Sequence, residues 1–533
     1  MSKERLYLFD TTLRDGAQTQ GVDFSAEDKR QIALALDALG LDYVEGGFPG
    51  ANPTDSEFFA GPPVLKSARL VAFGMTKRAG RSAANDPGLS AVLDAQAGAA
   101  CLVGKSWDYQ VNVALEIPLA ENLDGINQSL AAVKAKGREA LFDAEHFFDG
   151  YKANPDYALS CLVAALEGGA DWLVLCDTNG GSMPEEVARI VGEVRTKLPA
   201  ARLGIHAHND TEQAVAVTLA AIEAGARMAQ GTLNGLGERC GNANLCSLIP
   251  TLMLKEPFAS RYETGIAPEA LKRITQTSRL LDEILNRAPA RHAAYVGPSA
   301  FAHKGGLHSS AVAKDPRTYE HVPPESVGNR RKILVSDQAG RSNVLARLAE
   351  LGIDVDAKDP RVARLLEDVK QREYLGYAYD GAEASFELLA RRVLGQVPDY
   401  FEVESFRVIV ERRHNALGEQ VTVSEAVVKL KVAGEVLHNV SESKNGPIDA
   451  LNLALRKDLG KYSALLQDLK LVDFKVRILT SGTEAVTRVL VESADGQGNR
   501  WSTVGVSANI VDASFEALSD SICYKLYRDQ AGM

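Results

Sequence analysis

The stretch from Glu139 to Asp177, EALFDAEHFFDGYKANPDYALSCLVAALEGGADWLVLCD, decides the fold class of this 533-residue chain. Two short apolar runs, Glu139–Glu145 and Trp172–Asp177, lie on either side of a segment with helical periodicity. A strand, a helix and a second strand in this order form the unit from which parallel sheets are built. The stretch therefore predicts one βαβ unit.

The same unit repeats across the first half of the chain. One helical pattern, SAEDKRQIALALDALG (25–40), opens on Ser25 as the predicted N-cap, with Asp28 three residues later. Eight strand-then-helix units within about 250 residues fit a closed (β/α)8 TIM barrel, an α/β fold. An open doubly wound sheet is the alternative, because periodicity does not establish closure. The predicted strands are Leu6–Leu13, Tyr43–Phe48, Leu70–Met75, Ala100–Gly104, Glu139–Glu145, Trp172–Asp177, Leu203–His208 and Met228–Leu233.

The sequence pattern changes twice after the predicted barrel. Helical patterns with polar connections continue to residue 398, and β-rich runs return from about residue 401, with helical stretches near 447–459 and 513–527. Two strand–strand–helix halves would suit this tail. We therefore predict a TIM barrel over 1–270, a helical linker subdomain over 271–398 and a C-terminal α+β domain over 399–533.

Composition and charge argue against several classes of protein. Hydrophobic residues make up 45% and charged residues 24% of the chain, as in ordinary globular proteins. The sequence has no apolar run of about 18 residues, and its start, MSKERLYLFD, leaves no room for a signal segment. Six cysteines without a CxxC pair indicate a reducing compartment, and a net charge of -11 disfavours a nucleic acid partner. We expect a cytoplasmic protein that binds neither membrane nor nucleic acid.

Two histidines mark the end of the seventh predicted strand, and chemistry in such barrels takes place at the carboxyl ends of the strands. His206 and His208 lie two apart in GIHAHND (204–210), so both side chains are expected on one face. Two imidazoles that converge at the barrel mouth suit a divalent metal ion. The alternative is a core histidine and its hydrogen-bond partner.

Arg14 and Asp15 follow the first strand, in DTTLRDG (10–16). Asp15 could reach across the barrel mouth as a third metal ligand, whereas the alternative is an Arg–Asp pair that stabilises the turn. The planar guanidinium of Arg14 could bind a substrate carboxylate through two parallel hydrogen bonds.

A glycine-rich loop, GTLNGLGERCGNANL (231–245), follows the last strand. Asn242 could give its carbonyl oxygen to a metal ion, and Glu238 and Arg239 could form a structural pair. Cys240 is expected to be inert, because no base is evident nearby. The loop does not open the first helix of a strand–helix unit, so no dinucleotide cofactor is implied.

Further candidates lie at the fifth strand and beyond the barrel. Glu145 ends the fifth strand as a candidate acid or base, and its alternative is an ion-paired barrel residue. His303, His308 and Tyr319 could be solvated, although the paired glycines of HKGGLH (303–308) favour a loop that closely approaches another group. The other histidines are expected to be structural.

Four motifs together resemble a known family, the 2-isopropylmalate, homocitrate and citramalate synthases. They are DTTLRDG (10–16), HAHND (206–210), GERCGN (237–242) and HKGGLHSSAV (303–312). This family belongs to a superfamily of metal-dependent lyases and synthases built on a TIM barrel. The resemblance covers essentially the whole chain, and the segments AEHFFDGYKANPDYAL (144–159) and HAHNDTEQAVA (206–216) look most like the citramalate synthase branch.

The resemblance implies a role for each candidate residue. A divalent ion, which could be zinc, manganese or magnesium, would be bound by Asp15, His206, His208 and Asn242. Arg14 and Thr178 would hold a 2-oxo acid, and Glu145 matches the catalytic glutamate. His308 and Tyr319 match catalytic residues from a segment that reaches the neighbouring subunit, which implies a homodimer. Asp143 departs from the family pattern and leaves the pocket around the oxo acid's side chain undefined.

The resemblance also implies the reaction and its regulation. Acetyl-CoA would condense with a short 2-oxo acid, pyruvate in the citramalate branch, and hydrolysis would release CoA. Two tail segments, NGPIDALNLAL (445–455) and GVSANIVDASFEALSDS (505–521), resemble an effector-binding regulatory domain, for which isoleucine is the expected inhibitor. Alternatives are another 2-oxo acid, a superfamily lyase, which the long tail disfavours, or a non-catalytic barrel, which the strand-end polar groups disfavour.

Overall fold

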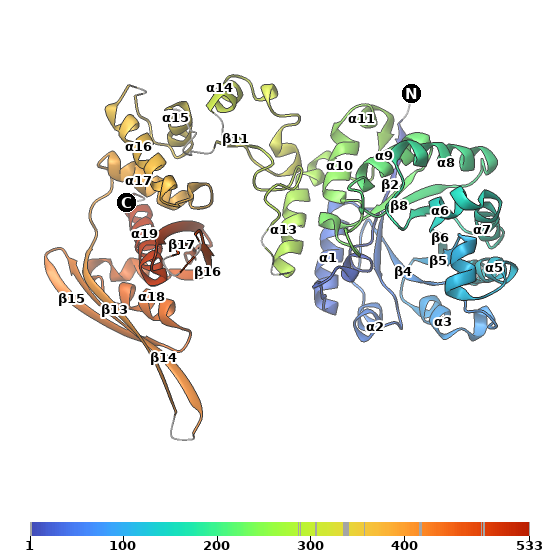
Figure 1. Cartoon of the computed structure of the whole chain (residues 1–533), viewed down its shortest axis with the longest axis horizontal. Helices are drawn as coiled ribbons and strands as arrows, with labels where there is room; N and C mark the ends of the chain where they lie inside the picture. Colours follow the sequence, from blue (N-terminus) through green and yellow to red (C-terminus); the bar gives the residue numbers. More distant parts are fainter. Residues whose placement is uncertain are drawn as a thin grey trace. The chain divides into compact units, whose positions relative to one another are not determined.

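The computed structural model describes residues 3–531 except 286, 288, 304–305, 334–340, 357, 415–417, 481 and 483–484. The chain divides into two compact units (Figure 1). The first contains Met1–Phe301 and His321–Arg331, and the second contains Ala302–Glu320 and Lys332–Met533.

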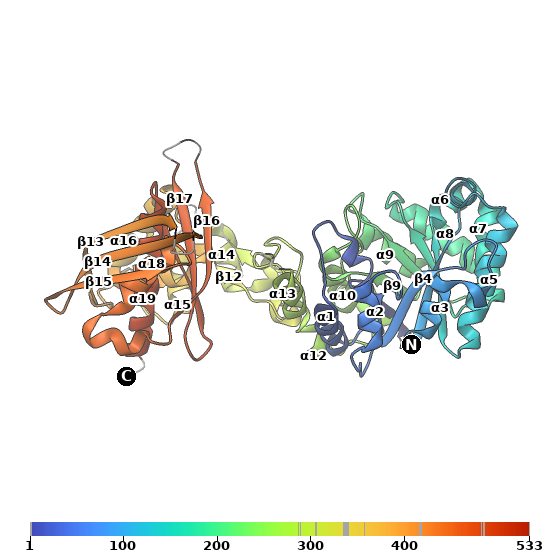
Figure 2. The ribbon, with the colours of Figure 1, turned by 90° about the horizontal axis from the view of Figure 1, so that it is seen from below.

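Eight parallel strands close into a barrel in the first unit (Figure 2). The strands are β2 (Tyr7–Asp10), β3 (Tyr43–Gly47), β4 (Arg69–Met75), β5 (Ala99–Lys105), β6 (Glu139–Glu145), β7 (Trp172–Asp177), β8 (Leu203–Ala207) and β9 (Met228–Gly231). Each pairs with the next along the chain, and β9 pairs with β2. All eight predicted strands are confirmed, and closure rules out the open sheet.

Helices follow the strands and pack on the outside of the barrel. They are α1 (Ala26–Leu39), α2 (Pro53–Ala60), α3 (Pro87–Asp94), α4 (Asp108–Gln110), α5 (Leu119–Ala135), α6 (Phe147–Ala153), α7 (Pro155–Glu167), α8 (Pro184–Lys197), α9 (Ala214–Ala224) and α10 (Leu245–Leu254). Ser25 caps α1 as predicted, because its hydroxyl accepts from the Asp28 amide while the Asp28 carboxylate accepts from the Ser25 amide. This reciprocal pair satisfies two amides that the helix leaves unbonded.

Residues of each strand alternate between two apolar cores. Leu141 belongs to the core inside the barrel, whereas Phe142 packs in the core between strands and helices. Successive side chains of a strand point to opposite faces. Asp143 and Glu145 on β6 therefore share the interior face with Leu141, and the carboxyl end of this face becomes polar.

The rest of the first unit consists of short elements and one longer helix. β1 (Glu4–Arg5) pairs with β10 (Tyr262–Glu263), and the helices are α11 (Phe258–Arg261), α12 (Pro268–Leu271) and α13 (Ile274–Ile284). The second unit begins with β11 (Ala302–His303), which pairs with β12 (Lys332–Ile333). The helices that precede its two antiparallel sheets are α14 (Gly306–Lys314), α15 (Arg341–Glu350), α16 (Pro360–Tyr374) and α17 (Glu383–Val393).

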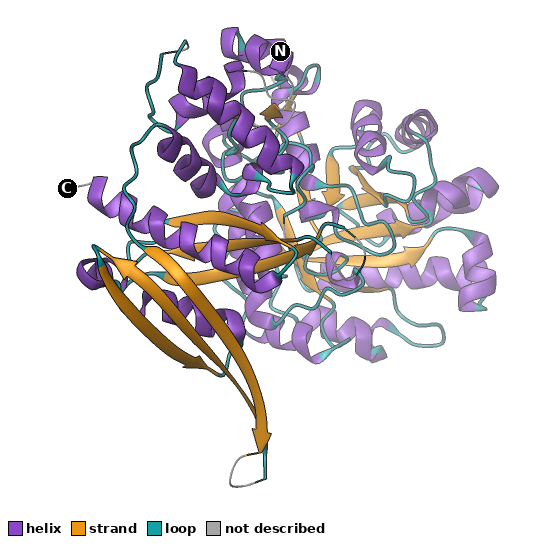
Figure 3. Cartoon of the chain, turned by 60° about the vertical axis from the view of Figure 1, so that its left-hand side comes forward, coloured by secondary structure: helices purple, strands orange, loops and turns teal. Residues whose placement is uncertain are grey.

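The C-terminal part contains two three-stranded antiparallel sheets, each followed by a helix (Figure 3). The first half is β13 (Glu402–His414), β14 (Gln420–Val432), β15 (Glu435–Ser443) and α18 (Pro447–Lys457). The second half is β16 (Lys470–Ile478), β17 (Thr487–Ala494), β18 (Arg500–Ser507) and α19 (Ile510–Ala531). The two-strand halves predicted from the sequence are wrong by one strand each. Both missed strands, β15 and β18, mix apolar residues with small or polar ones, and backbone hydrogen bonds to a neighbouring strand define them.

The two units do not coincide with the predicted boundaries at 270 and 398, because residues 302–320 group with the C-terminal part. The three-part division stays a prediction. Across the described ranges, no helix is both long and apolar enough to cross a membrane.

Candidate active site

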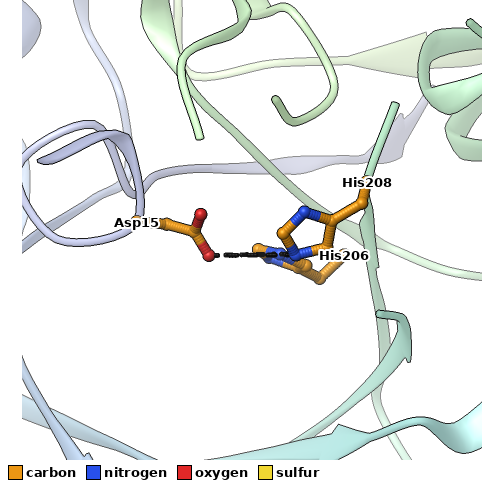
Figure 4. Close-up of side chains that lie close together, drawn as sticks. All are labelled: Asp15, His206 and His208. Atoms are coloured by element: carbon orange, nitrogen blue, oxygen red, sulfur yellow. Dashed lines mark hydrogen bonds and ion pairs between the residues drawn. The ribbon is translucent and has the colours of Figure 1, made fainter. Parts of the chain in front are cut away.

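Three buried side chains converge at the carboxyl end of the barrel (Figure 4). His206 lies on β8, His208 is the first residue after the end of β8, and Asp15 lies in the turn after β2. The Nε2 atoms of the two imidazoles are 3.3 Å apart. The Asp15 Oδ2 atom lies 3.7 Å from His206 Nε2 and 4.0 Å from His208 Nε2.

This donor set fits a divalent cation. Ligand atoms about 2.1 Å from one ion lie roughly 3.0–3.5 Å apart, so small side-chain movements would bring all three to bonding distance. The Asn242 amide nitrogen donates to Asp15 Oδ1 at 2.8 Å and to the Leu236 carbonyl at 3.0 Å. Within the described residues, the buried Asn242 Oδ1 has no hydrogen-bond partner. A buried carbonyl oxygen without a donor, next to a carboxylate, suits a fourth ligand.

The protonation states of the cluster also suit a cation. Burial alone would raise the pKa of Asp15, but the charges of Arg14 and the two histidines outweigh it and lower this pKa to about 2. Burial, with a smaller contribution from His206, lowers the pKa of His208 to about 4. At neutral pH Asp15 is therefore ionised and His208 is neutral, which are the forms that bind metal ions.

Arg14 is held in one orientation beside the cluster. Its Nε donates to Glu45 Oε2 at 2.7 Å, and its Nη1 donates to Asp15 Oδ2 at 3.0 Å. The guanidinium carbon lies 3.9 Å from the centre of the Phe73 ring. Thr11 Oγ1 donates to the same Glu45 oxygen at 2.5 Å. These contacts define the plane of the guanidinium before any substrate binds.

Glu145 lies at the wall of a cavity. Its Oε2 is 2.6 Å from Lys105 Nζ, and the two residues end the neighbouring strands β6 and β5 in register. The cavity has a volume of about 300 Å³, and Met75, Lys77 and Arg78 also line it. The ion-paired interpretation of Glu145 therefore describes one of its contacts, but its carboxylate also faces open space where a proton could be transferred.

Thr178 and the loop after β9 form a connected network. The Thr178 hydroxyl accepts from the His146 amide at 2.8 Å, and the Thr178 carbonyl accepts from Arg239 Nη2 at 2.8 Å. Arg239 also makes two hydrogen bonds to Asp210, at 2.7 and 2.9 Å. Its contact with Glu238 is longer, at 3.7 Å, so Asp210 rather than the predicted Glu238 is its main partner.

His308 and Tyr319 belong to the second unit. Their rings stack with centroids 4.2 Å apart and planes at 25°, and both residues are exposed. Lys304 and Gly305 of the same motif lie outside the described residues. The roles of His308 and Tyr319 at the barrel stay predictions.

Lys105 and Gln230 were not predicted as site residues, and Glu45, a polar residue of the second predicted strand, was given no specific role. Glu45 orients Arg14, Lys105 pairs with Glu145, and Gln230 contacts His206. On its own strand, each of these residues is an even number of residues away from a side chain of the interior core, so it lies on the interior face. Counting every second residue toward the strand end therefore identifies these positions. Their contacts could not be found in this way, because every partner lies on another strand or in a loop.

Comparison with known proteins assigns the chain to a family. Residues 5–280 match the HMGL-like family, residues 295–373 match the homocitrate synthase post-HMGL domain-like family, and residues 380–526 match the LeuA allosteric (dimerisation) domain. The first match covers the whole barrel together with the strand-end cluster.

Curated relatives match over the full length. The (R)-citramalate synthase of Aquifex aeolicus is 50% identical over 531 residues, which are 99% of each chain. The (R)-citramalate synthase of Geobacter sulfurreducens is 50% identical over 527 residues, 98% of each chain. The (R)-citramalate synthase of a Synechocystis species is 48% identical over 535 residues, 98% of this chain and 96% of the relative. The chain therefore belongs to the HMGL-like family and groups with those of its members that are named (R)-citramalate synthase.

Proposed function

We propose that this chain condenses acetyl-CoA with pyruvate and hydrolyses the resulting thioester to (R)-citramalate and CoA. The observation that carries the proposal is the cluster of Asp15, His206 and His208 beside Arg14, in a chain that is 50% identical over its full length to relatives named for this product. The fold and the family match agree with a synthase of this kind.

The cluster and Arg14 would bind the oxo acid side by side. Asp15, His206, His208 and Asn242 would hold a divalent ion, which supplies Lewis-acid polarisation of a ketone. Arg14 would bind the carboxylate of pyruvate, with Thr178 as a second polar contact. Because Glu45 and Phe73 already orient the guanidinium, its positive charge is in place where negative charge develops on the ketone oxygen.

Glu145 is the proposed base, with His308 as the alternative. A base must take a proton from the methyl group of acetyl-CoA, and the cavity beside Glu145 is the proposed position of that group. The methyl carbon then forms the new bond to the ketone carbon of pyruvate. Water cleaves the thioester afterwards, which releases CoA and makes the overall reaction effectively one-way.

A CoA-release assay with a panel of 2-oxo acids tests the substrate. We expect pyruvate to have a kcat/KM at least about tenfold above that of 2-oxoisovalerate or 2-oxoglutarate, since even one methylene in a fitted pocket changes this ratio by about 10–200-fold. A chelator should abolish release, and a divalent metal salt should restore it. Faster turnover of either larger acid would point instead to 2-isopropylmalate or homocitrate synthesis. Cleavage of citramalyl-CoA without net synthesis would point to a lyase.

We also propose that the C-terminal domain of a homodimer senses isoleucine. Residues 380–526 match an allosteric (dimerisation) domain, and the two β-sheet halves of this part share their own apolar core. Val504 and Val506 of β18 also pack with residues of α15, α16 and α17. Removal of everything after Tyr400 would expose that helical core, so the full-length chain is the better subject for a test.

Isoleucine should slow the full-length enzyme by about fivefold or more, because allosteric coupling is typically about 1–3 kcal/mol. Leucine and valine serve as matched controls in the same rate assay. Unchanged rates at a saturating excess of isoleucine would exclude it as the effector.

A further inference from the structure

We infer that Asp143 and Gln230 form a hydrogen-bonded relay that selects the metal-binding tautomer of His206, and that both are positioning residues. The inference rests on the proposed function only in taking the cluster of Asp15, His206 and His208 as a metal site. It assigns a role to Asp143, a buried aspartate on β6.

The relay connects three strands of the barrel. Gln230 on β9 has its Oε1 2.9 Å from His206 Nδ1, and its Nε2 donates to Asp143 Oδ1 on β6 at 3.1 Å. The exposed fractions are 4% for His206, 0% for Gln230 and 3% for Asp143. Water therefore has little access to any of the three side chains, so their hydrogen bonds must be made to other groups of the protein.

The direction of the two hydrogen bonds in the relay follows from the chemistry of Asp143 and His206. An ionised carboxylate only accepts hydrogen bonds, so Gln230 must turn its NH2 group toward Asp143. Its carbonyl oxygen then faces His206 Nδ1, which must carry the proton. In the neutral form of the ring, the lone pair is then on Nε2, the atom that faces His208 and Asp15.

Asp143 distinguishes between the two possible orientations of the Gln230 amide. The two ends of a glutamine amide have nearly the same shape, so packing alone distinguishes them poorly. With the amide reversed, NH2 would face His206 Nδ1 and favour a proton on Nε2, a form that cannot bind a metal ion there. A buried carboxylate makes the reversed amide costly, because it would place two acceptors against each other.

Other buried groups surround the Asp143 carboxylate, among them the carboxylate of Glu45. The positive charge of Arg14 attracts the Asp143 carboxylate. Burial raises the pKa of Cys101 well above its usual range, so this thiol is protonated and can donate to Asp143. The carboxylate thus has a cation and two donors, Gln230 and Cys101, as attractive partners, against the repulsion of the Glu45 carboxylate.

Isosteric substitutions test the relay in the full-length, metal-depleted protein, with Zn²⁺ affinity and the His206 tautomer as readouts. Asp143→Asn should weaken Zn²⁺ binding by about 10–100-fold, the usual size of effects at such partners of a ligand. Adding Gln230→Glu to Asp143→Asn should restore Zn²⁺ affinity. The amide and the carboxylate are then exchanged between the two positions, and the carboxylate at position 230 still accepts from His206 Nδ1. Asp177→Asn is the matched control, because Asp177 is a buried strand-end aspartate that bonds to Ser182 and not to His206.

Nitrogen chemical shifts of ¹⁵N-histidine-labelled, metal-free parent protein give a test that needs no folded relay variant. The His206 signals, assigned by their loss in His206→Gln, should show the proton on Nδ1. A proton on Nε2, Zn²⁺ affinity unchanged in Asp143→Asn, or no recovery in the double variant would overturn the relay. A parent chain that binds Zn²⁺ with this tautomer but releases no CoA would contradict the proposed function and leave the relay intact.

Discussion

His208→Ala is expected to abolish turnover and to lower the metal content of the purified protein. His208 Nε2 lies within 4.0 Å of both other members of the cluster, so its loss removes one of the ligands that would hold the ion. Metal ions contribute several kcal/mol to such reactions, so turnover should fall by at least about 10³-fold. Metal content is measured by elemental analysis and turnover by CoA release.

The control for this variant is His438→Ala, which removes an exposed histidine on β15 and should change neither quantity. His206→Ala should behave like His208→Ala, since the two rings converge on the same point. A His208→Ala protein with a full metal complement and a near-parent rate would show that the ligand assignment is wrong.

Glu145→Gln is expected to fold normally, keep its metal content and lose about 10²–10⁴-fold in turnover, the usual contribution of a general base. The side chain faces the cavity and is not a member of the metal cluster, so its loss should affect proton transfer and not metal binding. Steady-state kinetics with acetyl-CoA and pyruvate, together with elemental analysis, check both statements.

Two further variants separate a catalytic role of Glu145 from a structural one. Lys105→Gln breaks the same ion pair but keeps the carboxylate, so it should cost far less activity than Glu145→Gln. Glu121→Gln alters another glutamate of the cavity wall, whose Oε1 accepts from the Gly80 amide, and should leave the rate nearly unchanged. A Glu145→Gln rate within a few-fold of the parent, or equal losses in Glu145→Gln and Lys105→Gln, would reduce Glu145 to an ion-pair partner.

The barrel could be predicted because its signals are local. Each strand appears as a short apolar run, each helix as a 3.6-residue pattern, and α1 even shows its capping residues Ser25 and Asp28. The tail was harder, because β15 and β18 are defined by backbone pairing with β14 and β17 more than by their own side chains. Sheets with one solvent-facing side tolerate polar residues that weaken the sequence pattern.

The site was predictable in part for the same reason. His206 and His208 are two apart on one strand, so the sequence alone places their side chains on a common face, and Asp15 follows a strand end. The partners that orient these groups are far away in the chain. Gln230 lies 24 residues from His206, and Asp143 lies 87 residues from Gln230.

The sequence by itself determined the order of strands and helices, the strand ends where polar groups gather and the family to which the motifs point. Only the tertiary structure decided that Arg14 lies between Glu45 and Asp15, that Lys105 faces Glu145 and that Asp143 reaches His206 through Gln230. The physical reason is barrel closure. It brings interior side chains of strands distant in sequence together in a buried space, where each polar group must find its partner across the barrel and not along its own strand.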